Sequence, residues 1–128
     1  MSKKKFPPTI FNTTDFFGNL VSLSEQTWNV HIITEHTEMF GCEALVEKTV
    51  KDPFEVRLST AYDTGVAFIS APGVGSHAEG IRVIVAYADT NYEKGASTGK
   101  VTTAYPVDII NYGSPQLGKT IFKKGGKK

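Results

Sequence analysis

Two histidines, one arginine and a group of hydroxyl-bearing residues in this 128-residue chain suit phosphodiester chemistry without a metal. His31 and His36 can move protons near neutral pH. Arg57 can bind a phosphate through two N–H groups and stabilise the negative charge that develops on it. Hydroxyl groups that can position a phosphate come from Ser59, Thr103 and Tyr105. Because RNA carries its own nucleophile, the ribose 2′-hydroxyl, these residue types are compatible with metal-independent RNA cleavage.

Each of these residues also has a purely structural interpretation. A histidine near the single Trp28 can lie at the boundary of the core without any chemical role. Arg57 can be a solvent-facing charge that pairs with Glu55 or Glu93. Threonine is favoured in strands by its β-branched side chain alone, which is enough to explain Thr103. The residue types by themselves therefore leave a structural role and a catalytic role open.

Two helices are expected to carry or support these side chains. The first runs roughly from Glu25 to Glu38, with Ser24 as its N-cap and Trp28 and Ile32 on one face at a spacing of four. His31 lies three residues after Trp28, so the α-helical spacing predicts that it shares this face and meets the apolar seam. The second helix covers 42–51 and ends at Asp52-Pro53, because the residue before a proline disfavours the α conformation.

The remaining pattern predicts strands. Apolar and polar residues alternate over 54–59, and apolar runs cover 66–71, 81–88 and 100–105. Short segments at 9–13 and 20–23 form a predicted hairpin. On the last strand, alternation places Val101, Thr103 and Tyr105 on one face. Short connections favour antiparallel neighbours, so we expect an α+β domain: an N-terminal hairpin and two helices packed on a four-stranded antiparallel sheet.

Charge and composition divide the chain into a body and two ends. Eight lysines lie in the predicted tails, 1–8 and 119–128, which leaves six basic residues against all 13 acidic ones in the single domain predicted over 9–118. No apolar run could span a membrane and no signal peptide is evident, so we expect a cytoplasmic protein. One cysteine and three histidines make a structural zinc site unfavourable. Nucleotide-binding glycine motifs are absent, and we expect no cofactor and no metal.

The order of these segments resembles the phage-associated branch of the barnase–EndoU–colicin–RelE (BECR) nuclease superfamily. That branch usually has H-I-x-x-x-H-P-E-M where this chain has His31-Ile32 and, further on, His36-Thr37-Glu38-Met39. The similarity continues through three further segments, which are Lys51-Asp52-Pro53, Val56-Arg57-Leu58-Ser59 and Val83-Ile84-Val85 followed by Val101-Thr102-Thr103-Ala104-Tyr105. It covers about Leu20 to Pro106. Thr37 departs from the proline of the usual motif.

The resemblance implies a ribonuclease of the phage or toxin type, acting on tRNA or another RNA. It implies catalytic roles for His31, His36, Arg57 and Thr103. Groups expected to bind the substrate are Ser59, Tyr105, Arg82 and Lys100, the last two being basic helpers on an acidic body. An immunity or inhibitor protein and a second copy of the chain are further partners to consider. The acidic body also supports a different hypothesis, in which the domain is a non-catalytic interaction or oligomerising module.

Overall fold

The computed structural model describes residues 9–35, 37–59, 64–70, 80–106 and 117–123. Its strands are β1 (Thr9–Thr14), β2 (Leu20–Ser24), β3 (Glu55–Ser59), β4 (Gly65–Ile69), β5 (Ile81–Tyr87), β6 (Thr98–Pro106) and β7 (Leu117–Lys123). Its helical elements are η1 (Thr27–Ile32), α1 (Ile33–Glu35), η2 (Thr37–Met39), α2 (Glu43–Lys51) and η3 (Thr90–Lys94). The predicted tail over residues 1–8 lies outside the described residues.

The strands form one seven-stranded mixed sheet in the order β1-β2-β6-β5-β4-β3-β7. The predicted fold, a hairpin and two helices packed on a four-stranded antiparallel sheet, is therefore wrong. The hairpin β1-β2 extends the sheet, because β2 pairs with β6 in parallel and so satisfies backbone groups that an edge strand would leave open. At the other end, β7 pairs with β3. The predicted boundary at residue 118 thus falls inside a strand, where Ile121 and Phe122 supply apolar side chains.

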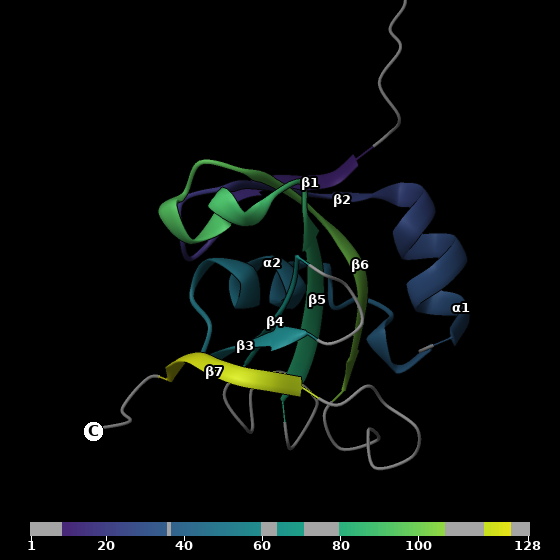
Figure 1. Cartoon of the computed structure of the whole chain (residues 1–128). Coiled ribbons are helices and arrows are strands. Elements are labelled where there is room, and N and C mark those ends of the chain that lie inside the picture. Colours follow the sequence, from purple (N-terminus) through teal and green to yellow (C-terminus); the bar gives the residue numbers. More distant parts are fainter. Residues whose placement is uncertain (1–8, 36, 60–63, 71–79, 107–116, 124–128) are drawn as a thin grey trace, which may run out of the picture.

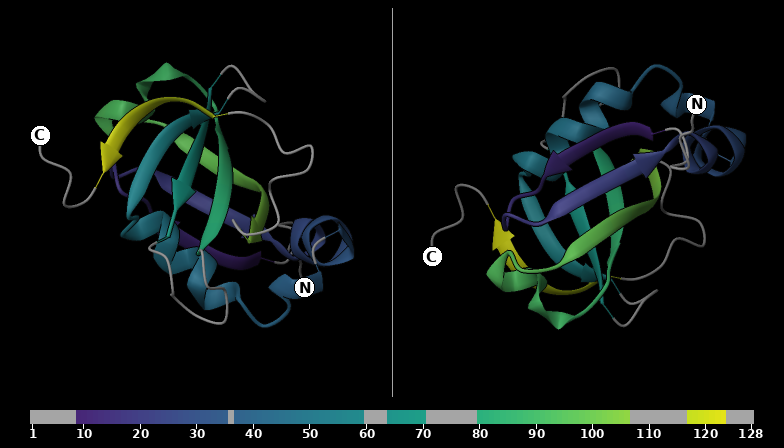
Figure 2. Two further views of the ribbon diagram at one scale, coloured as in Figure 1. Left: turned by 90° about the horizontal axis from the view of Figure 1, so that it is seen from below. Right: turned by 90° about the horizontal axis from the view of Figure 1, so that it is seen from above.

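The sheet coils strongly, so that β1 and β2 cross one end of the molecule and β7 crosses the other (Figure 1). Figure 2 shows the same coiling from above and below. The turn between β1 and β2 reaches the far strand, since the ring centroids of Phe16 and Phe122 are 4.6 Å apart. The backbone N–H of Phe16 also donates to the carbonyl of Val50, at the end of α2, over 2.9 Å. These contacts join the two ends of the sheet to α2.

One face of the sheet, the inner face, holds the main core. Val46 and Val50 of α2 are fully buried there against side chains such as Val56, Phe68 and Val83 of the strands. Trp28 and Ile32 of η1 belong to the same cluster, as the helical spacing of these two residues predicts. Burying apolar side chains of this size contributes roughly 1.5–3 kcal/mol each. Within the described ranges, no helix has the length and apolar character needed to cross a membrane.

A buried polar network fixes the turn between β1 and β2. The Asp15 carboxylate accepts hydrogen bonds from the backbone N–H groups of Phe17, Gly18 and Asn19, at 2.8–2.9 Å. The hydroxyl of Tyr87 on β5 donates to the same carboxylate, and its ring stacks on that of Tyr92 at 4.8 Å. Burial, together with the hydrogen bond and charge of Asp15, raises the pKa of Tyr87 well above its ordinary value. The network ties the hairpin to the centre of the sheet.

Candidate functional site

The face of the sheet opposite to α2, the outer face, carries most of the residues that the sequence singles out. The register places Arg57, Ala67, Ile84 and Thr103 directly opposite one another across β3, β4, β5 and β6. Residues directly opposite in antiparallel strands project on the same side of a sheet. Neighbouring strands are about 4.8 Å apart, so Arg57 and Thr103 are separated by roughly 14 Å at their Cα atoms.

A second row lies beside the first on the outer face. It runs through Glu55, Ile69, Arg82 and Tyr105. Tyr105 is buried, with an exposed fraction of 5%, and forms a small apolar cluster separate from the main core. The other members of that cluster are Ala67 and Ile84. Two guanidinium groups and the hydroxyl of Thr103 therefore surround an apolar floor to which the Tyr105 ring belongs, and the Tyr105 hydroxyl is itself buried. We name Arg57, Arg82, Thr103 and Tyr105 the outer-face group.

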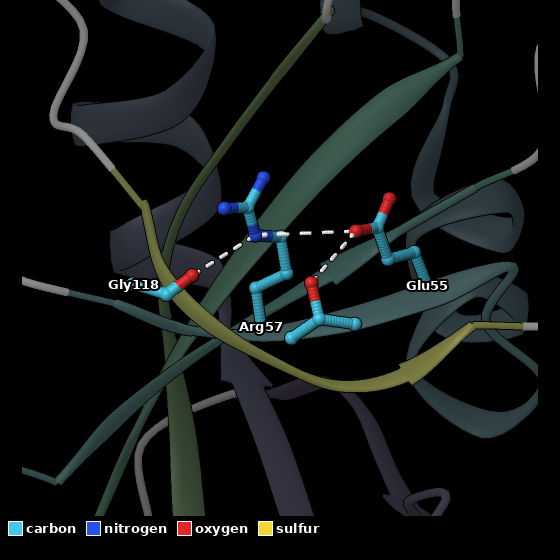
Figure 3. Close-up of polar contacts among 4 residues, drawn as sticks. Glu55, Arg57 and Gly118 are labelled. Atoms are coloured by element: carbon cyan, nitrogen blue, oxygen red, sulfur yellow. Dashed lines mark hydrogen bonds and ion pairs between the residues drawn. The ribbon is translucent and has the colours of Figure 1, made fainter.

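Arg57 is held at the β3–β7 edge of this face. Its Nε donates to the carbonyl of Gly118 over 3.0 Å and lies 3.9 Å from Oε2 of Glu55 (Figure 3). Among the described residues, no contact engages its two terminal nitrogens, which Figure 3 shows turned away from Glu55 and Gly118. Arg57 thus pairs with Glu55, one of the two partners that a structural role predicts, while its terminal N–H groups stay available for a bidentate contact.

Arg82 and Tyr105 form a second basic position. They are direct cross-strand partners, and Cζ of Arg82 lies 5.8 Å from the centroid of the Tyr105 ring. The Nε atom of Arg82 is buried and has no hydrogen-bond partner in the described part of the chain. A buried donor without a partner is costly. The Arg82 residue as a whole is only partly buried, so its positive charge lies at the outer face.

A bulge in β6 determines which side chains reach this face. Ile84 pairs with Thr103 but Val85 pairs with Val101, so Thr102 is an extra residue in β6. The prediction that Val101 shares a face with Thr103 is therefore wrong, because the inserted residue shifts the alternation by one. Val101 is buried in the inner core, whereas Lys100 lies opposite Ala86 on the outer face. Without the bulge, Lys100 and Thr103 would project on opposite sides.

His31 does not share the face of Trp28, contrary to the α-helical prediction. Residues 27–32 form a π-helix, in which hydrogen bonds span five residues instead of four. The wider turn keeps Trp28 and Ile32 together in the core but separates residues three apart. The side chain of His31 is 47% exposed, and its Nδ1 lies 3.8 Å from the Glu35 carboxylate. No described contact joins His31 to the outer-face group.

The helix that carries His31 nevertheless lies beside β6, the strand that carries Thr103 and Tyr105. Within β6, the residues that pair with β2 are 98–100. The helix η1, which leads into α1 in Figure 1, also contacts β6.

The remaining candidate residues lie elsewhere. Ser59, two residues after Arg57, is buried beside β7. Lys100 is exposed on β6. The candidate His36 lies outside the described residues.

Two contributors escaped the sequence analysis because both lie close to or inside the predicted tail. Gly118 supplies the carbonyl that holds Arg57, and the hydroxyl of Thr120 donates to Glu55 over 3.5 Å. Apolar Ile121 and Phe122 between polar neighbours were the available signal for a strand here. Lysines dominate the surrounding segment and mask that signal.

The arrangement can bind a phosphate and hold hydroxyl donors beside it. Glu55 is the one carboxylate that β3, β4, β5 and β6 place on the outer face within their described residues. In the described part of the molecule, no group of three His, Cys, Asp or Glu side chains could hold a metal ion. No protein-family model, no curated protein and no solved structure matches this chain.

Proposed function

We propose that this protein is a small metal-independent ribonuclease whose substrate lies on the outer face of the sheet. The observation that carries the proposal is the convergence of Arg57, Arg82, Thr103 and Tyr105 from three strands on one face. Guanidinium groups suit phosphate because their planar N–H pairs match two phosphate oxygens. The order of segments that resembles the BECR nucleases supports the same activity.

In the proposed reaction, the ribose 2′-oxygen forms a bond to the adjacent phosphorus and the bond to the 5′-oxygen breaks. The terminal N–H groups of Arg57 and the guanidinium of Arg82 bind the non-bridging oxygens and stabilise the added charge of the phosphorane. His31 or His36 takes the proton of the 2′-hydroxyl. The other histidine protonates the leaving oxygen, while Thr103 positions the phosphate.

The test is incubation of the purified protein with total RNA in the presence of EDTA. We expect discrete products ending in a 2′,3′-cyclic phosphate, and no cleavage of a 2′-O-methyl substrate, which lacks the nucleophile. Arg57→Ala should lose activity, and Arg57→Lys should recover only part of it because an ammonium group lacks the planar fork. Lys94→Ala removes an exposed lysine of η3 and is the matched control.

The histidine is tested in the same assay. His31→Ala should abolish cleavage while leaving the protein folded, since the His31 side chain is half exposed. Asn29→Ala, an exposed position on the same helix, serves as its control. Full activity of His31→Ala would remove His31 from the mechanism and leave His36 as the candidate base. Intact RNA in every sample of folded protein would refute the ribonuclease.

A second candidate function is a protein-interaction or oligomerising module. The observation that favours it is the exposure of two large apolar side chains around the first helix, Val30 at 63% and Phe40 at 80%. Exposed apolar side chains mark an interaction surface when they form a contiguous patch. Light scattering after size exclusion tests self-association. A dimer that dissociates on Phe40→Ser, together with no RNA cleavage, would favour this module over the nuclease.

A further inference from the structure

A cavity of about 500 Å³ lies where β1, β2 and β6 meet the beginning of η1. We name it the hairpin cavity. Hydroxyl, carboxamide and ammonium side chains line much of it, namely Asn12, Ser22, Ser24, Gln26, Thr27 and Lys100. None of the described residues that line it carries a carboxylate or an aromatic ring. A cavity of this size is within the range that holds a small organic ligand.

The hairpin cavity is continuous with the outer face. Asn12 pairs with Ser22, Ser22 pairs with Lys100, and Lys100 pairs with Ala86 of β5. One row of cross-strand paired residues therefore leads from the hairpin to β5, the strand that carries Arg82. Along β6, Lys100 lies three residues before Thr103, which corresponds to about 10 Å at the rise of a strand. The bulge at Thr102 places both on the outer face.

The lining matches the edge of a nucleobase combined with a phosphate. Carboxamides and hydroxyls both donate and accept hydrogen bonds, as the edge of a base requires. Within the described part of the chain, the side chains of Asn12, Ser22 and Gln26 make no hydrogen bond, so they are available to a ligand. Lys100 is exposed and offers a point charge for a phosphate. Ser24 and Thr27 hydrogen-bond one another over 3.0 Å and fix the far wall.

We propose that the hairpin cavity binds one base of the RNA strand, next to the phosphodiester on the outer-face group. This inference rests on the proposed function, because it places a flanking nucleotide of the same substrate. Lys100 contacts the phosphate between the two positions. Asn12, Ser22 and Gln26 read the base edge and give the enzyme a sequence preference.

The probes are four fluorescein-labelled 2′-O-methyl hexanucleotides, each of a single base, measured by polarisation in EDTA. They cannot be cleaved, so binding is separated from chemistry. The wild type should bind its preferred base roughly fivefold or more tighter than the weakest one. Asn12→Ala/Ser22→Ala should bring all four within about twofold, and Gln26→Ala should reduce the preference by itself. Lys100→Ala should weaken all four equally and lower the salt slope by about 1.

Thr14→Ala is the matched control, since Thr14 is exposed on β1 but does not line the hairpin cavity. Equal affinity of the wild type for all four probes, no binding, or a preference that survives in the folded Asn12/Ser22 variant would overturn the proposal. Cleavage of total RNA without base preference would refute the hairpin cavity but leave the ribonuclease intact. A base preference that depends on Asn12 and Ser22, without any cleavage of RNA, would support binding in the hairpin cavity and refute the ribonuclease.

Discussion

The guanidinium of Arg82 lies over the ring of its cross-strand partner Tyr105, with 5.8 Å between Cζ and the ring centroid. This contact orients Arg82 on the outer face, and the ring replaces part of the solvation that a buried charge loses. The Nε atom remains without a hydrogen bond among the described residues. The pair therefore holds a guanidinium group in a fixed position near the centre of the sheet, where β5 and β6 meet.

Arg82→Ala should reduce the cleavage rate on short RNA substrates by about ten- to a hundredfold. A hydrogen bond to a charged group contributes roughly 1.5–3 kcal/mol, which corresponds to that range. Arg82→Lys should retain the positive charge but recover little of the rate, because its ammonium lacks the planar geometry. Lys94→Ala should keep the wild-type rate. Equal rates for wild type and Arg82→Ala in single-turnover kinetics would exclude Arg82 from the site.

Glu55→Gln should tighten RNA binding by roughly two- to fivefold at low salt. Glu55 lies 3.9 Å from Nε of Arg57, and its negative charge opposes a phosphate at the same guanidinium. Glu55 and Arg57 are both partly exposed, and ion pairs near the surface contribute about 0.2–1 kcal/mol, so removing this charge should change the stability and the affinity only modestly. The difference should shrink as salt screens the charges. Weaker binding would instead mean that Glu55 acts mainly by positioning Arg57.

The strands that the sequence predicts well are those with a local pattern, which is alternation over 54–59 and a run of apolar residues in the other three. The ranges 54–59, 66–71, 81–88 and 100–105 correspond closely to β3, β4, β5 and β6. Their inner-face side chains are buried in the main core, and β4, β5 and β6 also bury Ala67, Ile84 and Tyr105 on the outer face, so a local apolar pattern marks each strand. The pairing of β2 with β6 and of β3 with β7 involves residues far apart along the chain. No local pattern encodes such a pairing, so the seven-stranded sheet could not be predicted.

Two single-residue irregularities explain why the candidate site was only partly predicted. The bulge at Thr102 moves Val101 inward, and the π-helix moves His31 away from Trp28. Each adds one residue to a regular repeat, and an ideal period of 2 or 3.6 cannot reveal it. Both bulges and π-helical turns are frequent at functional sites. The convergence of Arg57 with Thr103 depends on strand order, which only the structure gives.

Phe122→Ala should lower the free energy of unfolding by about 2 kcal/mol, measured by urea denaturation. The Phe122 ring contacts Phe16 across the two ends of the sheet and packs against the main core. Its loss removes buried apolar area and an aromatic pair, although Phe122 is only partly buried. Phe40→Ala is the control, because Phe40 is 80% exposed and should change the stability by less than about 0.5 kcal/mol. Equal stability of both variants would show that the Phe122 side chain adds nothing to the stability of the fold.

The stability of the protein should fall as the pH rises above about 10, the ordinary pKa of tyrosine. The pKa of Tyr87 is raised in the folded state by burial and by the hydrogen bond to Asp15, so the unfolded chain releases this proton first. Between pH 9 and 11, the ionisation of this tyrosine in the unfolded chain should lower the free energy of unfolding by about 1.4 kcal/mol. Tyr87→Phe should lower the stability at pH 8 but flatten its dependence on pH in this window. Tyr92→Phe leaves the hydrogen bond between Tyr87 and Asp15 in place and should retain most of the slope. Urea denaturation at each pH measures the difference, and an unchanged slope in Tyr87→Phe would refute the assignment.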